Sequence, residues 1–244
     1  RGAAPGVDLS VALALGPSGT SGQEDRVAQA IRWCRITQKA DIVSLSLGSE
    51  PGDGMGIQSE TTLAVQEALD AGIFVVAAAG NTGDDPDISD VSVPANLPGV
   101  IAVGSSTRSG SVWSNSAGGS LTNPYGDGNR SYPDQKPEVT APGVLLFSTT
   151  TTLIEPPYAY STGTSDSTVL VTGALALILE LHGAALAGDD GVIDSDEMGI
   201  VKRALASSCD KTGIDGSPHD IRGGYGMLDA VQWASDIAFE LNLA

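Results

Sequence analysis

The sequence predicts a single α/β domain with a mainly parallel central sheet, and three observations lead to this prediction. Short apolar runs alternate with amphipathic stretches along the chain, which is typical of strands that alternate with helices. The run 73–79 is apolar at every position, as strands are when helices cover both faces of a parallel sheet. The length of 244 residues suits one domain with one large core.

The first part of the chain predicts two strands and two helices. In the run 7–15, apolar residues first alternate with polar ones and then become continuous, so we expect a strand there. Ser21-Gly-Gln-Glu24 is a capping box before a helix. Four residues share the apolar face of that helix, namely Val27, Ala30, Ile31 and Cys34. A second strand is expected over 41–47 and a loop over 49–58, followed by a helix from Ser59 to Ala71 that ends at Gly72.

The rest of the chain continues the alternation. Strands are expected over 73–79 and 100–103, a long surface loop over 115–135 and extended structure over 139–148. From Thr164 to His182 the pattern is helical and mostly apolar, which predicts a buried helix. Two more helices are expected over 196–207 and 226–242. No internal repeat or linker divides the chain.

The charge balance excludes several classes of partner. Thirty acidic residues against 12 basic ones give a formal charge of −18 and a pI near 4.1. This balance leaves no basic patch, so nucleic acid and anionic membranes are not expected partners. No apolar run was found that approaches the ~20 residues of a membrane span. The two cysteines, Cys34 and Cys209, form no disulfide framework, and no Cys/His cluster has zinc spacing.

The kind of acidity indicates a high-salt organism. Aspartate (21) outnumbers glutamate (9), and only four lysines are present. A solvated acidic surface keeps a protein soluble when salt screens charge repulsion. An ordinary acidic secreted protein has a similar composition, so both interpretations stay open here.

The first candidate for chemistry is the segment Tyr160-Ser-Thr-Gly-Thr-Ser165, which leads directly into the buried helix. A serine at a helix N-terminus lies where unpaired backbone N–H groups and the helix dipole favour negative charge. A hydrolase needs such a place when a substrate carbonyl becomes an oxyanion. A serine before a helix also serves as an ordinary cap, and by itself this motif favours the cap.

The second candidate is Asn81, in the segment Ala77-Ala-Ala-Gly-Asn-Thr-Gly83 that ends the most apolar strand. Ligands of open parallel sheets bind beyond the carboxyl ends of the strands. An asparagine amide there can donate to a developing oxyanion, although an Asn-Thr-Gly turn is the plain alternative. The full Gly-x-Gly-x-x-Gly nucleotide fingerprint is missing.

These segments, in this order, resemble those of the subtilisin-like serine proteases. Gly163-Thr-Ser165 matches the nucleophile motif of that family, and Asn81 follows the strand end that carries its oxyanion-hole asparagine. Four further segments match family landmarks in the same order: Ala40–Gly48, Pro94–Val103, Lys136–Gly143 and Gly223–Ala230. The resemblance implies a three-layer fold lacking its N-terminal strands and extending over 1–244 as one N-terminally incomplete peptidase domain.

The resemblance also implies a role for each site residue. Ser165 is the expected nucleophile and Asn81 the expected oxyanion-hole donor. Five residues are expected to bind the substrate: Ser46, Leu47, Gly48, Ala79 and Gly80. The implied partners are a peptide or protein substrate and the protein's own N-terminal segment or prosegment. The implied location is extracellular.

The triad Asp and His of such a protease are expected outside this chain. In this family they precede a Gly-Val-Ala-Pro segment, which Ala3-Ala-Pro-Gly6 matches. A helix rises ~1.5 Å per residue, which places His182 about 25 Å from Ser165, too far for a general base. His219 is expected to be a surface turn residue. The alternative to a protease is therefore a catalytically inactive domain used for binding or assembly.

Two acidic features complete the sequence analysis. Asp166 stands where the family has Met, and a carboxylate beside the nucleophile disfavours an oxyanion nearby. The run 188–197 fits the second half of a calcium loop through Asp190, Asp194 and Glu197, but Leu186 and Gly188 occupy its first ligand positions. Asp194 and Glu197 also form a helix-capping pair, which we favour, so no cofactor is assigned and calcium stays an open alternative.

Overall fold

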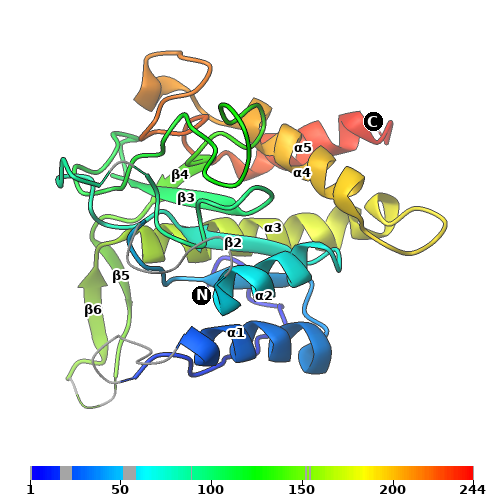
Figure 1. Cartoon of the computed structure of the whole chain (residues 1–244), viewed down its shortest axis with the longest axis horizontal. Helices are drawn as coiled ribbons and strands as arrows, with labels where there is room; N and C mark the ends of the chain where they lie inside the picture. Colours follow the sequence, from blue (N-terminus) through cyan, green and yellow to red (C-terminus); the bar gives the residue numbers. More distant parts are fainter. Residues whose placement is uncertain are drawn as a thin grey trace.

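The centre of the computed structural model, which describes residues 2–16, 24–51, 59–88, 90–151, 153 and 155–243, is a parallel sheet. Its strands lie in the order β1-β2-β3-β4 and comprise Ile42–Leu45, Phe74–Ala78, Ile101–Ser106 and Val139–Pro142 (Figure 1). Parallel neighbours need crossover connections, and these connections carry the helices and long loops. The prediction of an α/β domain with a parallel central sheet is confirmed.

Within the described residues, five α-helices and a separate hairpin surround this sheet. The helices are α1 (Glu24–Trp33), α2 (Glu60–Leu69), α3 (Thr164–Leu186), α4 (Ser195–Ser208) and α5 (Ala230–Glu240), with a π-helical turn at Cys34–Gln38 and a 3-10 turn at Thr212–Ile214. Strands β5 (Leu146–Thr149) and β6 (Tyr158–Ser161) form the antiparallel hairpin. In Figure 1 this hairpin extends from the sheet beside the start of α3.

Both faces of the sheet are covered. Every residue of β2 and β3 is buried. On one face, the hydroxyl of Thr172 in α3 bonds to Ser44 of β1 at 2.9 Å, and α3 runs along all four strands. Val43 and Leu45 point to the opposite face, where they are buried, while α2 packs on β2 and against α1. This arrangement is the layered one that the near-continuous apolar strands predicted.

Helix α3 has the length and hydropathy of a membrane-spanning helix. No run of this kind was expected from the sequence. Helix α3 contacts the four strands and α5, and Val171, Leu175 and Ile178 are buried in the core. The helix also carries Asp166 near its start and Glu180 near its end. In this fold α3 is therefore the central helix of the domain.

The strand predicted over 7–15 is wrong. Those residues have no strand structure, and the alternating side chains of Val7, Leu9, Val11 and Leu13 are 51 to 95% exposed. Among the described strands, β1 pairs only with β2 and forms the edge of the sheet. Alternation predicts which side chains share a face, but a strand also needs a neighbour that bonds to its backbone.

The helix ends follow the capping signals closely. The Ser59 side chain accepts from the backbone of Thr62, and Asp194 and Glu197 form the capping box of α4. Helix α5 begins four residues later than predicted, because Met227 is held in β-bridges to Thr140 and Asp210. Strand β6 was not predicted. The capping box at Ser21–Glu24 rests on positions 21–23, which lie outside the described residues.

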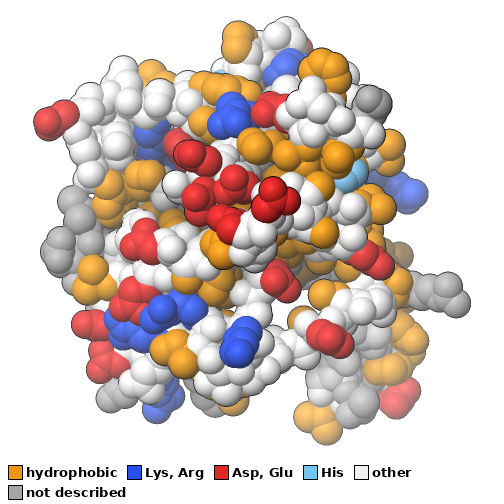
Figure 2. Space-filling view, turned by 90° about the vertical axis from the view of Figure 1, so that its right-hand side faces the viewer, with side chains coloured by type: hydrophobic (Ala, Val, Ile, Leu, Met, Phe, Trp, Pro, Cys, Tyr) orange, Lys and Arg blue, Asp and Glu red, His pale blue; other side chains and the backbone are white. Residues whose placement is uncertain are grey.

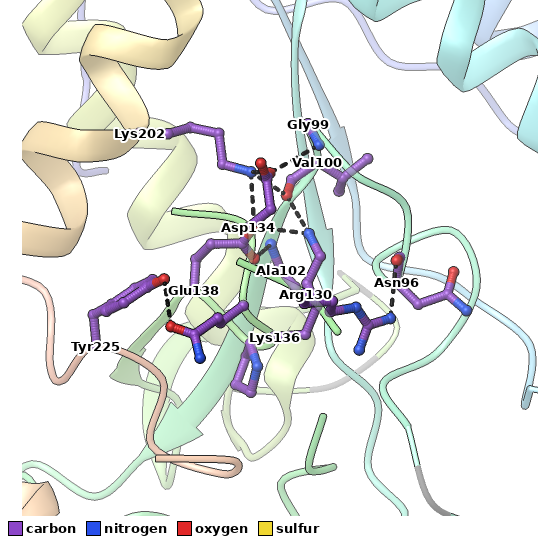
Figure 3. Close-up of polar contacts among 12 residues, drawn as sticks. Asn96, Gly99, Val100, Ala102, Arg130, Asp134, Lys136, Glu138, Lys202 and Tyr225 are labelled. Carbon is purple, nitrogen blue, oxygen red and sulfur yellow. Dashed lines mark hydrogen bonds and ion pairs between the residues drawn. The ribbon is translucent and has the colours of Figure 1, made fainter. Parts of the chain in front are cut away.

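A buried network of charges holds the amino ends of β3 and β4 together (Figure 3). The Glu138 carboxylate lies 2.7 Å from the ammonium of Lys136 and 2.8 Å from that of Lys202, and it also accepts from the backbone of Ala102. Lys202 pairs in addition with Asp134, while Lys136 donates to the carbonyl of Val100. The side chains of Lys136, Glu138 and Lys202 are each at least 95% buried. This network links the loop before β4, the start of β3 and helix α4.

Burial and pairing act in opposite directions on the two lysines. Burial lowers the pKa of Lys136 to about 8, although Glu138 favours its charged form. Burial also disfavours the charge of Lys202, but the nearby Glu138 and Asp134 outweigh it, and the pKa of Lys202 is raised. The same ammonium groups lower the pKa of Asp134 to about 2 against its own burial.

We expect the midpoint of thermal unfolding to rise as sodium chloride is added. On the face shown in Figure 2, acidic side chains gather at the centre of the view, and the chain carries a charge of −18. The Debye length falls from about 10 Å at 0.1 M to about 3 Å at 1 M salt, so screening relieves the repulsion of the compact state. A flat or falling midpoint in chloride titrations would contradict the hypothesis that the protein comes from a high-salt organism.

Candidate active site

The candidate site lies where the carboxyl ends of β1 and β2 meet the start of α3. Ser46, Leu47 and Gly48 follow β1, and Ala79, Gly80 and Asn81 follow β2. Helix α3 begins at Thr164, so Ser165 is in its first turn. The turn at Gly143, beyond β4, allows this approach, because a Cβ there would lie 2.1 Å from the Ser167 hydroxyl.

Two hydrogen bonds from Thr164 fix the orientation of Asn81. The backbone N–H and the hydroxyl of Thr164 both donate to Asn81 Oδ1, at 2.9 and 3.0 Å. The Thr164 hydroxyl in turn accepts from the backbone N–H of Gly80 at 3.2 Å. Because the backbone N–H of Thr164 can only donate, its partner must be the Oδ1 atom of Asn81, and the Nδ2 group is directed elsewhere.

The Asn81 side chain and the Ser165 backbone nitrogen lie around the same point beside Gly163. The position that a Cβ of residue 163 would take is 3.5 Å from Asn81 Nδ2 and 3.7 Å from Ser165 N. Since residue 163 is glycine, no side chain fills that space. The structure therefore brings Asn81 and Ser165 together on one side of the sheet, as their places in the sequence predicted.

The end of β1 is bonded to the first turn of α3. The Ser165 hydroxyl donates to the carbonyl of Ser46 at 3.4 Å, and the Ser46 hydroxyl donates to the carbonyl of Ser165 at 3.1 Å. Among the described residues, no hydrogen bond engages the backbone groups of Leu47 and Gly48. With respect to the described residues, this short segment therefore has unpaired backbone donors and acceptors beside Ser165.

Ala79 and Gly80 have backbones that are already engaged inside the protein. Ala79 is fully buried, donates to Val103 and accepts from Ser92. Gly80 donates to Thr164, accepts from Ala117 and has a φ of +111°, a conformation that favours glycine. In this geometry the two residues set the position of Asn81.

Neither histidine of the chain reaches Ser165. His182 lies near the far end of α3, about 25 Å along a helix that rises ~1.5 Å per residue. His219 was expected to be a surface turn residue, and it lies in a loop outside the helices and strands. It is half-buried, its Nε2 lies 3.0 Å from the carbonyl of Pro137 and its ring packs edge-on against Tyr225, and burial lowers its pKa. Pro137 precedes β4, at the opposite end of the sheet from the candidate site.

A profile of the subtilase family matches residues 1–225 of the chain. The chain belongs to the subtilase family. It is 35% identical over 181 residues to "Subtilisin E" of Bacillus subtilis (strain 168), which covers 74% of this chain and 41% of that protein. It is 36% identical over 180 residues to the "Major intracellular serine protease" of the same organism, covering 72% of this chain and 48% of the relative.

Solved structures agree with the subtilase fold. The self-cleaved protease domain of PatA superposes with a TM-score of 0.66 at 22% identity, covering 90% of this chain and 69% of that one. The PatG macrocyclase in complex with peptide superposes with a TM-score of 0.63 at 20% identity, covering 91% of this chain and 58% of that one. The subtilase chain described here spans about half or less of the length of the two curated relatives named above.

One residue of the candidate site, Thr164, was not among the site residues predicted from the sequence. It had been treated only as part of the Gly-Thr-Ser motif, yet its hydroxyl and N–H determine how Asn81 is turned. The sequence contained a signal for this role, because a threonine directly before the expected nucleophile has both a hydroxyl and a backbone N–H that can donate to Asn81.

The acidic run before α4 forms the predicted helix cap. Asp194 accepts from the backbone of Asp196, and the Glu197 carboxylate accepts from the backbone of Asp194 at 3.0 Å. Asp190 accepts from the backbone of Val192. In the part of the subtilase chain that the structure describes, no three Asp, Glu, His or Cys side chains gather as a metal site would require. The carboxylates of Asp194 and Glu197 form the cap of α4, and that of Asp190 forms a turn before it.

Proposed function

We propose that this domain is the nucleophile-bearing part of a subtilisin-type serine endopeptidase. The observation that carries the proposal is the common space that Asn81 Nδ2 and the Ser165 backbone nitrogen share beside Gly163. Two donors beside one point at the start of a helix are the arrangement that an acyl-transfer enzyme requires for its oxyanion. The family profile over residues 1–225 supports the same chemistry.

In the proposed reaction Ser165 Oγ attacks the carbonyl carbon of the scissile peptide bond. Its proton passes to a general base, and the carbonyl electrons move onto the oxygen, which accepts hydrogen bonds from Asn81 Nδ2 and Ser165 N–H. The tetrahedral intermediate then expels the amine, which takes up the proton, and leaves an acyl-enzyme. Water hydrolyses this ester by the same steps and restores the Ser165 hydroxyl.

The acyl side of the peptide is proposed to pair with the segment that follows β1. Leu47 and Gly48 have backbone groups without partners among the described residues, and Ser46 is bonded to Ser165 itself. A peptide that adds to this segment as an extended strand would bring its carbonyl to Ser165. Its residues would displace the weak bond between the Ser165 hydroxyl and Ser46.

The general base is proposed to come from a part of the protein outside these residues, as the expected N-terminal Asp and His. The chain offers an open surface for such a part. On α3, which contacts β1 at the edge of the described sheet, the apolar side chains of Val169, Leu177 and Leu181 are exposed. A pocket of about 300 Å³ between α3 and the first residues of the chain is lined by Ala4, Gly6, Val7, Ala176, Leu177 and Glu180.

One observation favours a second candidate function, a catalytically inactive binding domain. Neither His182 nor His219 lies near Ser165, and a serine without a base is a weak nucleophile.

The extracellular location belongs to the protease proposal and rests on family resemblance, although one relative is named an intracellular protease.

We expect residues 1–244 alone to hydrolyse peptides far more slowly than a protease does. Without its base, a triad enzyme keeps only the residual catalysis of the oxyanion site and of binding. The assay compares this chain with a longer form of the protein that contains the upstream sequence, and Ser165→Ala serves as the control for contaminants. Activity of the longer form that Ser165→Ala abolishes supports the protease, whereas a longer form that binds peptide without cleaving it supports the binding domain. Fast cleavage by residues 1–244 themselves, lost in Ser165→Ala, would show that the base lies within them.

A further inference from the structure

The carboxylate of Asp166 lies beside the candidate nucleophile, on the side of the β5–β6 hairpin. Its Oδ2 accepts from the hydroxyl of Ser161 at 2.8 Å. Ser161 is the last residue of β6, which leads through Thr162 into the turn before α3. The segment that follows β1 approaches Ser165 through Ser46, from a different element. A peptide lying across Ser165 from the Ser46–Gly48 segment would therefore continue toward Asp166.

Asp166 has no cationic partner in the described part of the chain. The ion pairs there use other carboxylates, those of Glu60, Glu67, Asp90, Asp134, Glu138 and Glu240. Asp166 is itself only partly buried. Its single side-chain partner is the neutral hydroxyl of Ser161, so its charge remains available to a ligand.

The position of Asp166 has an electrostatic cost for the proposed reaction. It is adjacent in the chain to Ser165, whose backbone nitrogen lies 3.7 Å from the Cβ position of Gly163, beside the space proposed for the oxyanion. A carboxylate on the residue next to Ser165 opposes the negative charge that develops on the substrate oxygen. A positive group bound to Asp166 would remove that opposition at the moment when the oxyanion forms.

We propose that Asp166 makes this site select peptides with a lysine or arginine immediately after the scissile bond. This proposal rests on the proposed function, since it takes Ser165 as the point of cleavage. The positive side chain would bind the carboxylate directly and offset its effect on the oxyanion. The net charge of −18 adds a longer-range attraction for cationic peptides.

The aromatic side chains of the hairpin do not provide an alternative recognition site for this residue. Phe147 stacks with Tyr158 and contacts Tyr160, which makes an exposed aromatic cluster. Tyr160 and Ser161 are consecutive in β6 and so point to opposite faces of the hairpin. Asp166 is bonded to Ser161 and lies on the face away from the rings, so its recognition is by charge.

The test measures peptide binding in the Ser165→Ala background, in which no cleavage can confuse the result. Three labelled octapeptides are identical except for lysine, leucine or glutamate after the scissile position, and a fourth peptide contains the acyl half alone. We expect the lysine peptide to bind about tenfold more tightly than the glutamate peptide at low salt, with leucine between them. Multimolar sodium chloride should reduce this ratio.

Two variants in the same background locate the effect at Asp166. Asp166→Asn keeps an acceptor for Ser161 and should bring the lysine-to-glutamate ratio close to one, and Asp166→Lys should reverse the preference. Asp196→Asn is the matched control, because it removes the same charge from the first turn of α4 and should leave the ratio unchanged.

The outcomes separate this proposal from the proposed function. If the acyl half binds but the three octapeptides bind equally, or if Asp166→Asn keeps the preference for lysine, the assignment to Asp166 is overturned and the protease proposal stands. If neither the acyl half nor any octapeptide binds, the proposed function fails and the role of Asp166 fails with it.

Discussion

Replacing Asn81 by leucine is expected to lower kcat for peptide hydrolysis by about 10²–10³-fold in the form of the protein that contains its general base. Leucine has nearly the same shape but no N–H, so the oxyanion loses one of its two proposed donors. KM should change little, because the bond forms only as the carbonyl oxygen becomes charged. Steady-state kinetics on one peptide substrate measure both constants.

A second substitution and a control make the interpretation specific. Thr164→Val removes the hydroxyl that donates to Asn81 Oδ1 but keeps the backbone donor. We expect it to lower kcat less than Asn81→Leu does. Asn129→Leu changes the same residue type in the exposed loop between β3 and β4 and should leave kcat unchanged. An unaltered kcat in Asn81→Leu would remove Asn81 from the mechanism.

Replacing Glu138 by glutamine is expected to lower the free energy of unfolding by about 3–5 kcal/mol. The substitution keeps the shape of the side chain but leaves the ammonium groups of Lys136 and Lys202 buried without their shared carboxylate. Asp134 pairs only with Lys202, so it cannot replace Glu138 beside Lys136. Urea unfolding at neutral pH gives the change in free energy.

Two further variants test this explanation. Glu180→Gln removes a carboxylate from the exposed face of α3 and should change stability by less than about 0.5 kcal/mol. A triple variant with Lys136→Met, Glu138→Leu and Lys202→Met removes every charge centred on Glu138 and should be far more stable than Glu138→Gln alone. A loss below about 1 kcal/mol in Glu138→Gln would contradict the view that this network is buried and mutually dependent.

Much of the fold was predictable because its signals are local. The apolar runs that became β2 and β3 are buried on both faces and needed no knowledge of their neighbours. Ser59 and Asp194 cap their helices with bonds to residues within three positions along the chain. The proximity of Asn81 and Ser165 was predicted from the family resemblance and from their places in the chain, one beyond the carboxyl end of a parallel strand and the other at the start of a helix.

The features that were not predicted depend on distant partners. Residues 7–15 have the alternation of a strand, but whether they form one depends on a neighbouring strand. Glu138 is bound by Lys202, which lies 64 positions away, and by itself a lysine on a helix indicates a solvated face. The partial burial of His219 was not predicted, because the packing of Tyr225 against its ring leaves no trace in the local sequence.

The separation between Asn81 and Thr164 also makes the site an indicator of folding. These residues are 83 positions apart, and α3 reaches Asn81 only by lying across all four strands. A partly folded chain that has formed the sheet without docking α3 would therefore have intact strands and no site. Such a species would keep much of its circular dichroism signal while losing its affinity for peptides, so the two measurements together would reveal whether the docking of α3 is a separate step.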